Sequence, residues 1–201
     1  MNQKQSKKIT DFFFELGMLK RQKHCGFALA GVSNNLRSLA DHTARAAVMA
    51  YILAELEGVN PEKTATICLI HDFPEMRIGD HHKIASRYLK TKPAEKQAFL
   101  EQTKDLPEKV KKTWRKYHQE LEKRNTLEGV VAKDADWLEQ AVSAREYIAE
   151  GHKAAQNWID NVRKALETQS AKKLLKEIEK IDPSNWWQGL KKMTYKKLKK
   201  R

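Results

Sequence analysis

The chain has 201 residues, and 39 lysines and arginines against 26 aspartates and glutamates give it a formal net charge of +13. This length allows one domain with a substantial core. The basic excess favours anionic partners such as nucleotides, nucleic acids or an acidic surface. No segment approaches the roughly 18 to 20 apolar residues of a membrane span, and no signal peptide is recognisable at the start. The two cysteines, Cys25 and Cys68, form no disulfide framework. We therefore expect a cytoplasmic protein that does not enter a membrane.

The sequence predicts an all-α fold, because glycine and proline are sparse and the alternation typical of strands is scarce. We expect a first helix over residues 9–19 and a loop over residues 20–35. Ser38 and Asp41 predict a capped start for a second helix that runs to about Leu56. Its apolar face is expected to contain Ala44, Ala47, Val48, Tyr51 and Ile52.

A third helix is expected over residues 60–72, capped by Asn60 and stopped by Pro74, with a turn or short helix beyond it. Further helices are predicted over residues 93–102, 107–124 and 127–150, and one basic helix over residues 154–180. We expect Trp186 and Trp187 to pack the following segment against the body. The chain then divides into a helical domain, residues 1–180, and a basic C-terminal tail, residues 181–201, whose lysines are solvated.

The pair His71-Asp72 carries most of the functional information. It ends an apolar run, and an aspartate is almost never buried without a partner. A bound cation would satisfy both side chains. The expected neighbours Asp41-His42 and Lys133-Asp134-Ala135-Asp136 supply further ligand types, and imidazole with carboxylate suits zinc, manganese, cobalt, nickel or iron alike. The remaining histidines are expected to be ordinary structural or surface residues: His24, His81, His82, His118 and His152.

Four blocks within about residues 12–148 together resemble the HD-domain phosphohydrolases, and most closely the HD-domain 5′-deoxynucleotidase family. The blocks are Arg37 to His42, Leu69 to Glu75, Ile78 to Asp80 and Lys133 to Asp136. The resemblance implies an HD-domain-like helical bundle with a basic C-terminal extension, and a homodimer. It also implies that His42, His71, Asp72 and Asp136 bind one divalent metal. In the same way Glu75 would orient or deprotonate the attacking water, and Asp80 would be a second carboxylate near the substrate.

Two positions leave alternatives open. Helical periodicity places Asp134 on the apolar stripe of its helix and Asp136 nearly opposite, whereas the Lys-x-x-Asp spacing of the family selects Asp136. In the first loop the family has an arginine beside an aromatic residue that meets the phosphate. Here Phe27 is the expected aromatic residue, and Arg21 or Lys23 would take the place of the arginine.

The expected function is therefore metal-dependent hydrolysis of the phosphomonoester of (deoxy)nucleoside 5′-monophosphates. One alternative is hydrolysis of another nucleotide or alarmone-like phosphate ester. A non-catalytic nucleic-acid-binding module that uses the basic tail is less favoured, because the sequence contains no recognised nucleic-acid-binding motif.

Overall fold

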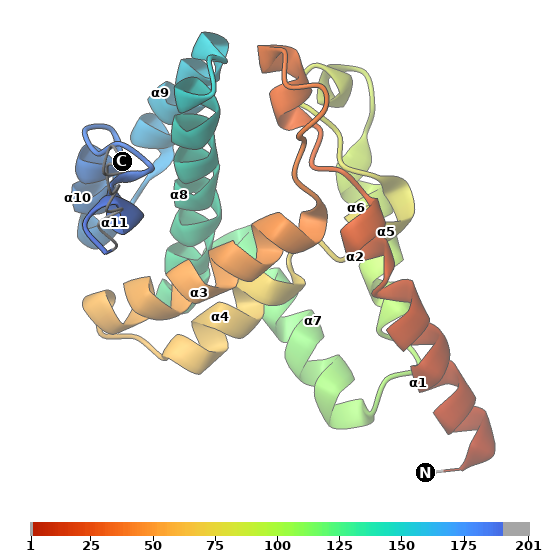
Figure 1. The fold of residues 1–201 in the computed structure, drawn as a ribbon. Helices are drawn as coiled ribbons and strands as arrows, with labels where there is room; N and C mark the ends of the chain where they lie inside the picture. Colours follow the sequence, from red (N-terminus) through yellow and green to blue (C-terminus); the bar gives the residue numbers. More distant parts are fainter. Residues whose placement is uncertain (1, 191–201) are drawn as a thin grey trace, which may run out of the picture.

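The computed structural model describes residues 2–190, and within that range the fold is all-α, as predicted (Figure 1). Helices α3 (Leu39–Glu57) and α4 (Pro61–Ile70) form a hairpin that packs on the long helix α8 (Leu127–Ala149). Helix α7 (Glu108–Lys123) packs on α4 and α8, while α9 (Gln156–Ala165) and α10 (Gln169–Ile178) cover α8. The residues expected to bind the metal, on α3, on α8 and after α4, therefore have helices on several sides.

The remaining elements are short or peripheral. Helices α1 (Gln3–Glu15) and α2 (Met18–Arg21) lie on the same side as α5 (Glu75–Ile78) and α6 (Thr91–Gln102), and α1 projects from the body (Figure 1). Short 3-10 helices occupy Gly26–Ala30 (η1), Ala85–Arg87 (η2) and Lys153–Ala155 (η3). Helix α11 (Asn185–Gln188) follows α10.

The predicted helix starts are confirmed at the two helices that lead into the site. Ser38 accepts a hydrogen bond from the Asp41 amide, and the Asp41 carboxylate accepts one from the Ser38 amide at 2.7 Å. Asn60 caps α4 through the Lys63 amide at 2.7 Å. Gly58 ends α3 in the left-handed conformation, with φ of 70°. These local signals fix where α3 begins and ends and where α4 begins, and they thereby fix the position of His42 on α3 and of His71 at the end of α4.

Two apolar clusters form the core. The larger lies among α3, α4, α8, α9 and α10, and contains the buried Cys68. The smaller joins α1, α5, α6 and α7, and its buried members are Phe12, Ile70, Phe73, Met76, Phe99 and Leu106. His71 and Asp72 stand between Ile70 and Phe73, and their backbone is therefore held by that second cluster.

The predicted apolar face of α3 is wrong. Val48, Tyr51 and Ile52 are 62%, 41% and 52% exposed, whereas the buried face carries mostly small residues such as Ala46 and Ala50. Small side chains allow α3 to approach α4 and α8 closely, so the large side chains point outward. The result is a stripe of exposed apolar residues, defined here as the α3 stripe: Val48, Tyr51, Ile52 and Leu56.

Two predicted helices are interrupted. The first ends at Glu15 and a new turn begins after Gly17. The expected helix over residues 154–180 is divided between α9 and α10, because Leu166 is extended and Thr168 caps a new start. The helices over residues 60–72, 93–102, 107–124 and 127–150 are confirmed to within a few residues.

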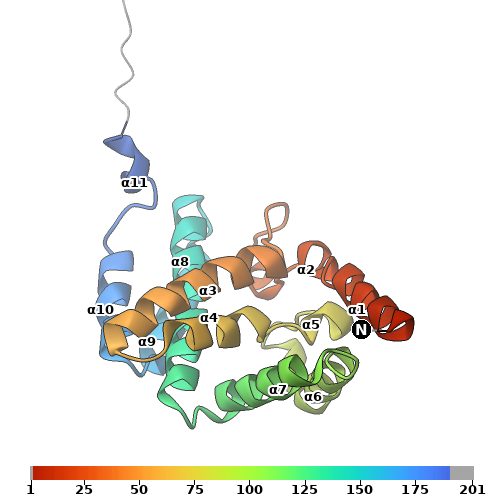
Figure 2. The ribbon, with the colours of Figure 1, turned by 90° about the horizontal axis from the view of Figure 1, so that it is seen from below.

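The expectation that Trp186 and Trp187 pack against the body is wrong. Their side chains are 75% and 52% exposed, and α11 stands apart from the bundle (Figure 2). Most of the basic tail lies outside the described residues. Over residues 2–190, no helix has the length and hydrophobicity that crossing a membrane requires.

Candidate metal centre

Two histidines and two aspartates from three parts of the chain meet at one point. His42 is on α3, His71 and Asp72 follow the last turn of α4, and Asp136 is on α8. The Nε2 atoms of His42 and His71 are 3.3 Å apart. Asp136 Oδ1 lies 3.2 Å from His42 Nε2 and 3.5 Å from His71 Nε2. Asp72 approaches the same two nitrogens at 3.4 and 3.1 Å. The structure therefore brings together all four residues expected to bind the metal.

Both imidazole rings are held by their other nitrogen. His71 Nδ1 lies 2.6 Å from the Cys68 carbonyl oxygen, which can only accept, so Nδ1 carries the proton. His42 Nδ1 contacts the Glu139 carboxylate in the same sense. Each Nε2 is therefore the nitrogen that faces the cluster. This is the arrangement of a metal-binding histidine whose outer hydrogen bond sets the tautomer.

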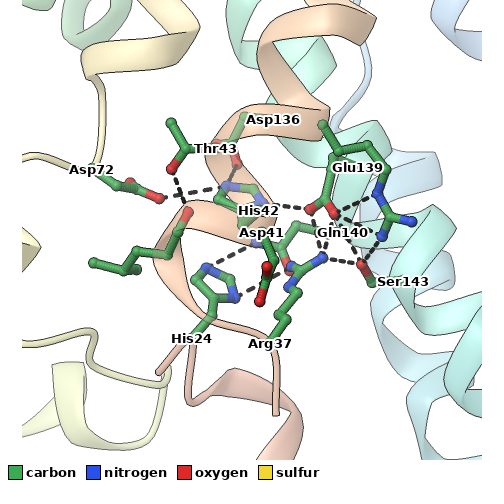
Figure 3. Close-up of polar contacts among 12 residues, drawn as sticks. His24, Arg37, Asp41, His42, Thr43, Asp72, Asp136, Glu139, Gln140 and Ser143 are labelled. Atoms are coloured by element: carbon green, nitrogen blue, oxygen red, sulfur yellow. Dashed lines mark hydrogen bonds and ion pairs between the residues drawn. The ribbon is translucent and has the colours of Figure 1, made fainter. Parts of the chain in front are cut away.

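Glu139 is the centre of a buried ionic network behind His42 (Figure 3). It accepts hydrogen bonds from Arg37 at 2.5 Å, from Arg45 at 2.9 Å and from Ser143 at 3.0 Å. The hydrogen bond from His42 and the positive charges around it overcome burial and lower the pKa of Glu139 to about 2. Glu139 is therefore a carboxylate with a fixed orientation.

The electrostatics of the cluster favour a cation. Burial alone lowers the pKa of His42, but bonds to Asp136 and Glu139 outweigh it and raise the pKa to about 9. Lys133 and His71 hold the pKa of Asp136 well below its usual range, although burial opposes them. Imidazole and carboxylate donors at this spacing fit a divalent transition-metal ion. The residues present therefore suit the ion that the sequence implied.

The two aspartates of α8 have different surroundings. Asp134 is fully buried against the start of α10 and accepts hydrogen bonds from the amides of Glu167 and Thr168, at 3.0 and 2.7 Å. It also accepts one from the Thr168 hydroxyl. Asp136 points toward the histidine pair instead. Helix α8 is buried on more than one side, so helical periodicity did not identify which aspartate faces the cluster.

A polar cavity of about 180 Å³ opens on the cluster. Its lining includes His71, Asp72, Asp136, Glu75 and Lys133. Glu75 Oε2 is buried without a hydrogen-bond partner, and burial together with the charge of Asp72 raises its pKa well above the ordinary value. A carboxylate in this state suits proton transfer inside the cavity.

The Asp80 carboxylate is hydrogen-bonded to the first loop. Its Oδ2 accepts a hydrogen bond from the Cys25 amide at 2.5 Å, and burial raises its pKa. This contact ties the segment after α5 to the loop that carries His24. Asp80 also lines a groove of about 580 Å³, next to the cavity, with Trp137, Trp158 and Gln140.

The three expected substrate residues are not brought together. Arg21 and Lys23 are exposed, and neither lines the cavity or the groove beside Asp80 within the described chain. Phe27 is fully buried, with its ring stacked on Trp158 at 4.7 Å between centroids. Trp158 therefore presents the aromatic surface that the sequence assigned to Phe27, since it lies between Phe27 and the groove.

Sequence reasoning missed His24 and His118. The His24 ring stacks on the His42 ring beside the cluster, with centroids 4.6 Å apart (Figure 3). His24 lines both the cavity and the groove beside Asp80. With His42 and Asp72 it forms a second compact set of ligand atoms. His118 lines the cavity from α7. Nothing in the spacing of these residues distinguishes them from the other histidines.

Replacing Glu139 with glutamine should weaken divalent-metal binding about 10- to 100-fold. The reason is that a neutral amide oxygen accepts the hydrogen bond from His42 Nδ1 more weakly than a charged carboxylate does. Glu146→Gln is the matched control, since Glu146 binds Arg45 at 2.6 Å but is not among the partners of His42. Competition with a chromophoric chelator measures the affinity. Equal losses in the two variants would contradict the orienting role.

Replacing Asp134 with asparagine should lower the free energy of unfolding by about 1–3 kcal/mol, because the amides of Glu167 and Thr168, just before α10, lose a charged acceptor. Its metal affinity should stay close to that of the parent protein. Asp136→Asn should show the reverse pattern. Urea unfolding and chelator competition on both variants separate the two roles, and loss of metal from Asp134→Asn would refute this assignment.

Comparisons with known proteins identify the family of the chain. The sequence model of the HD domain matches residues 16–179. The 5′-deoxynucleotidase HDDC2 of Homo sapiens is 26% identical over 177 residues, which cover 87% of this chain and 86% of the relative. The protein of the same name from Dictyostelium discoideum is 32% identical over 152 residues, 71% of this chain and 78% of the relative.

Solved structures show the same architecture. A conserved hypothetical protein from Pyrococcus furiosus aligns with a TM-score of 0.70 at 29% identity, covering 86% of this chain and 99% of that one. A predicted metal-dependent phosphohydrolase from Magnetospirillum magnetotacticum aligns with a TM-score of 0.68, covering 88% and 91% of the two chains; at 21% identity this likeness shows the fold alone. Since the family match spans most of the chain and includes every residue of the cluster, this protein belongs to the HD domain family.

Proposed function

We propose that this protein is a metal-dependent phosphohydrolase that acts on deoxynucleoside 5′-monophosphates. The observation that carries the proposal is the convergence of His42, His71, Asp72 and Asp136 beside the unpartnered carboxylate of Glu75. Relatives named 5′-deoxynucleotidase, at 26% and 32% identity, support the substrate class.

The four converging residues would hold one divalent ion, for which manganese, cobalt, zinc, nickel, iron and magnesium are all candidates. The chemistry that such an ion supplies is polarisation of a phosphoryl oxygen and a lowered pKa of water. Glu75 would take the proton from the attacking water, since it lines the same cavity and has no other partner. Glu139 and the Cys68 carbonyl keep the histidines in the required orientation.

The substrate phosphate would be compensated by lysines of the cavity. Lys92 and Lys133 both line it, and Lys133 Nζ already lies 2.7 Å from Asp136 Oδ2. Because Arg21 and Lys23 lie outside this lining, we assign phosphate contact to Lys92 and Lys133 in their place.

The nucleoside would occupy the groove beside Asp80, defined here as the α8–α9 groove. It adjoins the cavity at His24, and its volume of about 580 Å³ is in the range of small-molecule sites. Trp137 and Trp158 offer aromatic surface, and Gln140 offers an amide that can pair with a base edge.

A substrate panel tests the proposal. The metal-reconstituted protein should release inorganic phosphate from deoxynucleoside 5′-monophosphates faster than from ribonucleotides or 3′-monophosphates. Release of pyrophosphate from an alarmone-like substrate, with no phosphate from the monophosphates, would show that the substrate is an alarmone-like ester and not a deoxynucleoside monophosphate.

Glu75→Gln should retain the metal but lose about 10²- to 10⁴-fold in kcat, the usual contribution of a general base. Glu62→Gln, an exposed position on α4, is the control for a lost carboxylate. Elemental analysis and phosphate release are measured on the same preparations. Near-normal turnover by Glu75→Gln would remove this residue from the mechanism.

We further propose that the protein is a homodimer that pairs through the α3 stripe. Four large apolar side chains on successive turns, each 41–62% exposed, are an uncommon surface for a monomer. A two-fold axis lets such a stripe cover itself. Antiparallel pairing would bring the exposed Glu55 of one copy toward Lys20 and Lys23, which lie beside the start of α3 in the other.

Val48→Asp combined with Ile52→Asp should convert the dimer to a monomer, because the contact would bury four unpaired carboxylates. Light scattering coupled to size-exclusion chromatography measures the mass. The exposed pair Phe13→Asp and Phe14→Asp on α1 is the matched control. A dimer that survives the α3 changes and dissociates with the α1 changes would move the interface to α1.

A further inference from the structure

A second groove adjoins the metal cavity between α6 and α7, and we name it the α6–α7 groove. Its volume is about 660 Å³, and four of its lining residues also line the cavity: Lys92, Glu95, His118 and Glu122. It has no lining residue in common with the α8–α9 groove within the described chain. The cavity is therefore flanked by two separate grooves of similar size, whereas a mononucleotide needs only one.

The α6–α7 groove carries positive charge without carboxylate partners. Lys92 is paired with Glu95 at 2.9 Å and with Glu122 at 3.3 Å, which accounts for both acidic residues of the lining. Over residues 2–190, the other three cations of the lining form no salt bridge: Lys96, Arg115 and Lys123.

Arg115 is nevertheless held in place. It donates to the Thr103 hydroxyl at 3.0 Å and to the Leu100 carbonyl oxygen at 2.6 Å, and these neutral partners orient the guanidinium without cancelling its charge. A positioned cation beside two free lysines suits a phosphate group.

The same groove has an aromatic wall. The His118 ring stacks on Phe99 with centroids 4.2 Å apart and an interplanar angle of 21°. Burial lowers the pKa of His118, so the ring is neutral at neutral pH. Leu100, 40% exposed, extends the apolar surface. A stacking surface next to unpaired cations is the combination by which proteins hold single-stranded nucleic acid.

We propose that the α6–α7 groove binds the nucleotide attached to the scissile phosphate in a short single-stranded oligonucleotide, which gives the enzyme a phosphodiesterase activity beside its monoesterase activity. This inference rests on the proposed function, because the nucleoside with the 5′-oxygen occupies the α8–α9 groove in both reactions. The preceding nucleotide leaves the cavity past Lys92 and His118, and its own phosphate meets Lys96, Arg115 and Lys123.

The same bond breaks in both substrates. Water loses a proton to Glu75 and its oxygen bonds to phosphorus, while the bond between phosphorus and the 5′-oxygen breaks. The 5′-oxygen takes a proton back from Glu75 and leaves as a hydroxyl group. A dinucleotide therefore yields a free nucleoside and a nucleoside 3′-monophosphate, and water is the only co-reactant.

Binding of fluorescein-labelled hexathymidylate to the full-length, chelator-treated protein tests the groove, with fluorescence anisotropy as the readout. Lys96→Ala with Lys123→Ala should raise Kd on the order of tenfold near 0.1 M salt, and should lower the salt slope by about 1.4, since each single-strand phosphate contact contributes about 0.7. The matched control, Lys109→Ala with Lys112→Ala, removes two exposed lysines of α7 that lie outside the lining. Equal weakening by both pairs, or none by the groove pair, would overturn the proposal.

Turnover of the trinucleotide d(TpTpT), in which the nucleotide before the scissile phosphate carries a phosphate of its own, by the metal-reconstituted protein provides the second arm. Thymidine and the dinucleotide with a 3′-terminal phosphate, d(TpTp), are the expected products. The groove pair should lower the ratio of trinucleotide to monophosphate turnover, which the control pair should leave unchanged. Hydrolysis of thymidine 5′-monophosphate without trinucleotide cleavage would refute the phosphodiesterase activity alone. Hydrolysis of neither substrate would refute the proposed function, and the anisotropy arm would still report on the groove.

Discussion

The structure depends on the requirement that a buried cluster of carboxylates be compensated by positive charge. Asp72, Asp136 and Glu139 all approach His42 within a region where exposure is low. Carboxylates taken out of water cost several kcal/mol each unless they are paired. Arg37 and Arg45 compensate Glu139 on one side of His42, and Lys133 compensates one oxygen of Asp136. The carboxylate charge that remains on the other side of His42 favours a cation.

This compensation divides the residues around His42 into two layers. In the layer behind the ring the hydrogen bonds of Glu139 are satisfied, because its carboxylate accepts from two arginines and a serine. This layer holds the imidazole in place. The layer in front contains atoms that only partly satisfy one another, among them the unpartnered oxygen of Glu75. Incomplete satisfaction in a buried position is typical of a site built for a ligand. Chemistry is therefore expected only on the side that faces the cavity.

Under the two proposals, the cavity would let one centre act on two kinds of substrate. Its walls pass into a groove with two tryptophans on one side and into a groove with three free cations on the other. The first offers flat apolar surface and amides, which suit a nucleoside. The second offers charge and a stacked imidazole, which suit a further phosphate-linked unit. Part of the net charge of +13 thus lies next to the cavity, on Lys96, Arg115 and Lys123.

Local sequence signals determined the helices that lead into the site and the residues that end them. Ser38 with Asp41, Asn60 with Pro61, and Pro74 act over a few residues, so the starts of α3 and α4 and the break after His71-Asp72 follow from the chain alone. The four residues of the cluster were also recognisable, because their types and spacing resemble those of a known family. The expected burial of His71-Asp72 at the end of an apolar run gave the physical reason to expect a bound cation there.

Tertiary packing decided what periodicity could not. Val48 and Ile52 have the spacing of a core face, yet α3 buries its alanines, because close approach to α4 and α8 depends on small side chains. Asp134 and Asp136 are two residues apart on a helix that is buried around much of its circumference, so their surroundings depend on which neighbours cover each side: α10 for one, α3 and the end of α4 for the other. His24 and His118 carry no local signal, and only the folded chain places them beside the cavity. The sequence by itself thus determined the helices and the ligand types, whereas contacts between distant segments decided which side chains meet, because those contacts depend on three-dimensional packing rather than on neighbours in the chain.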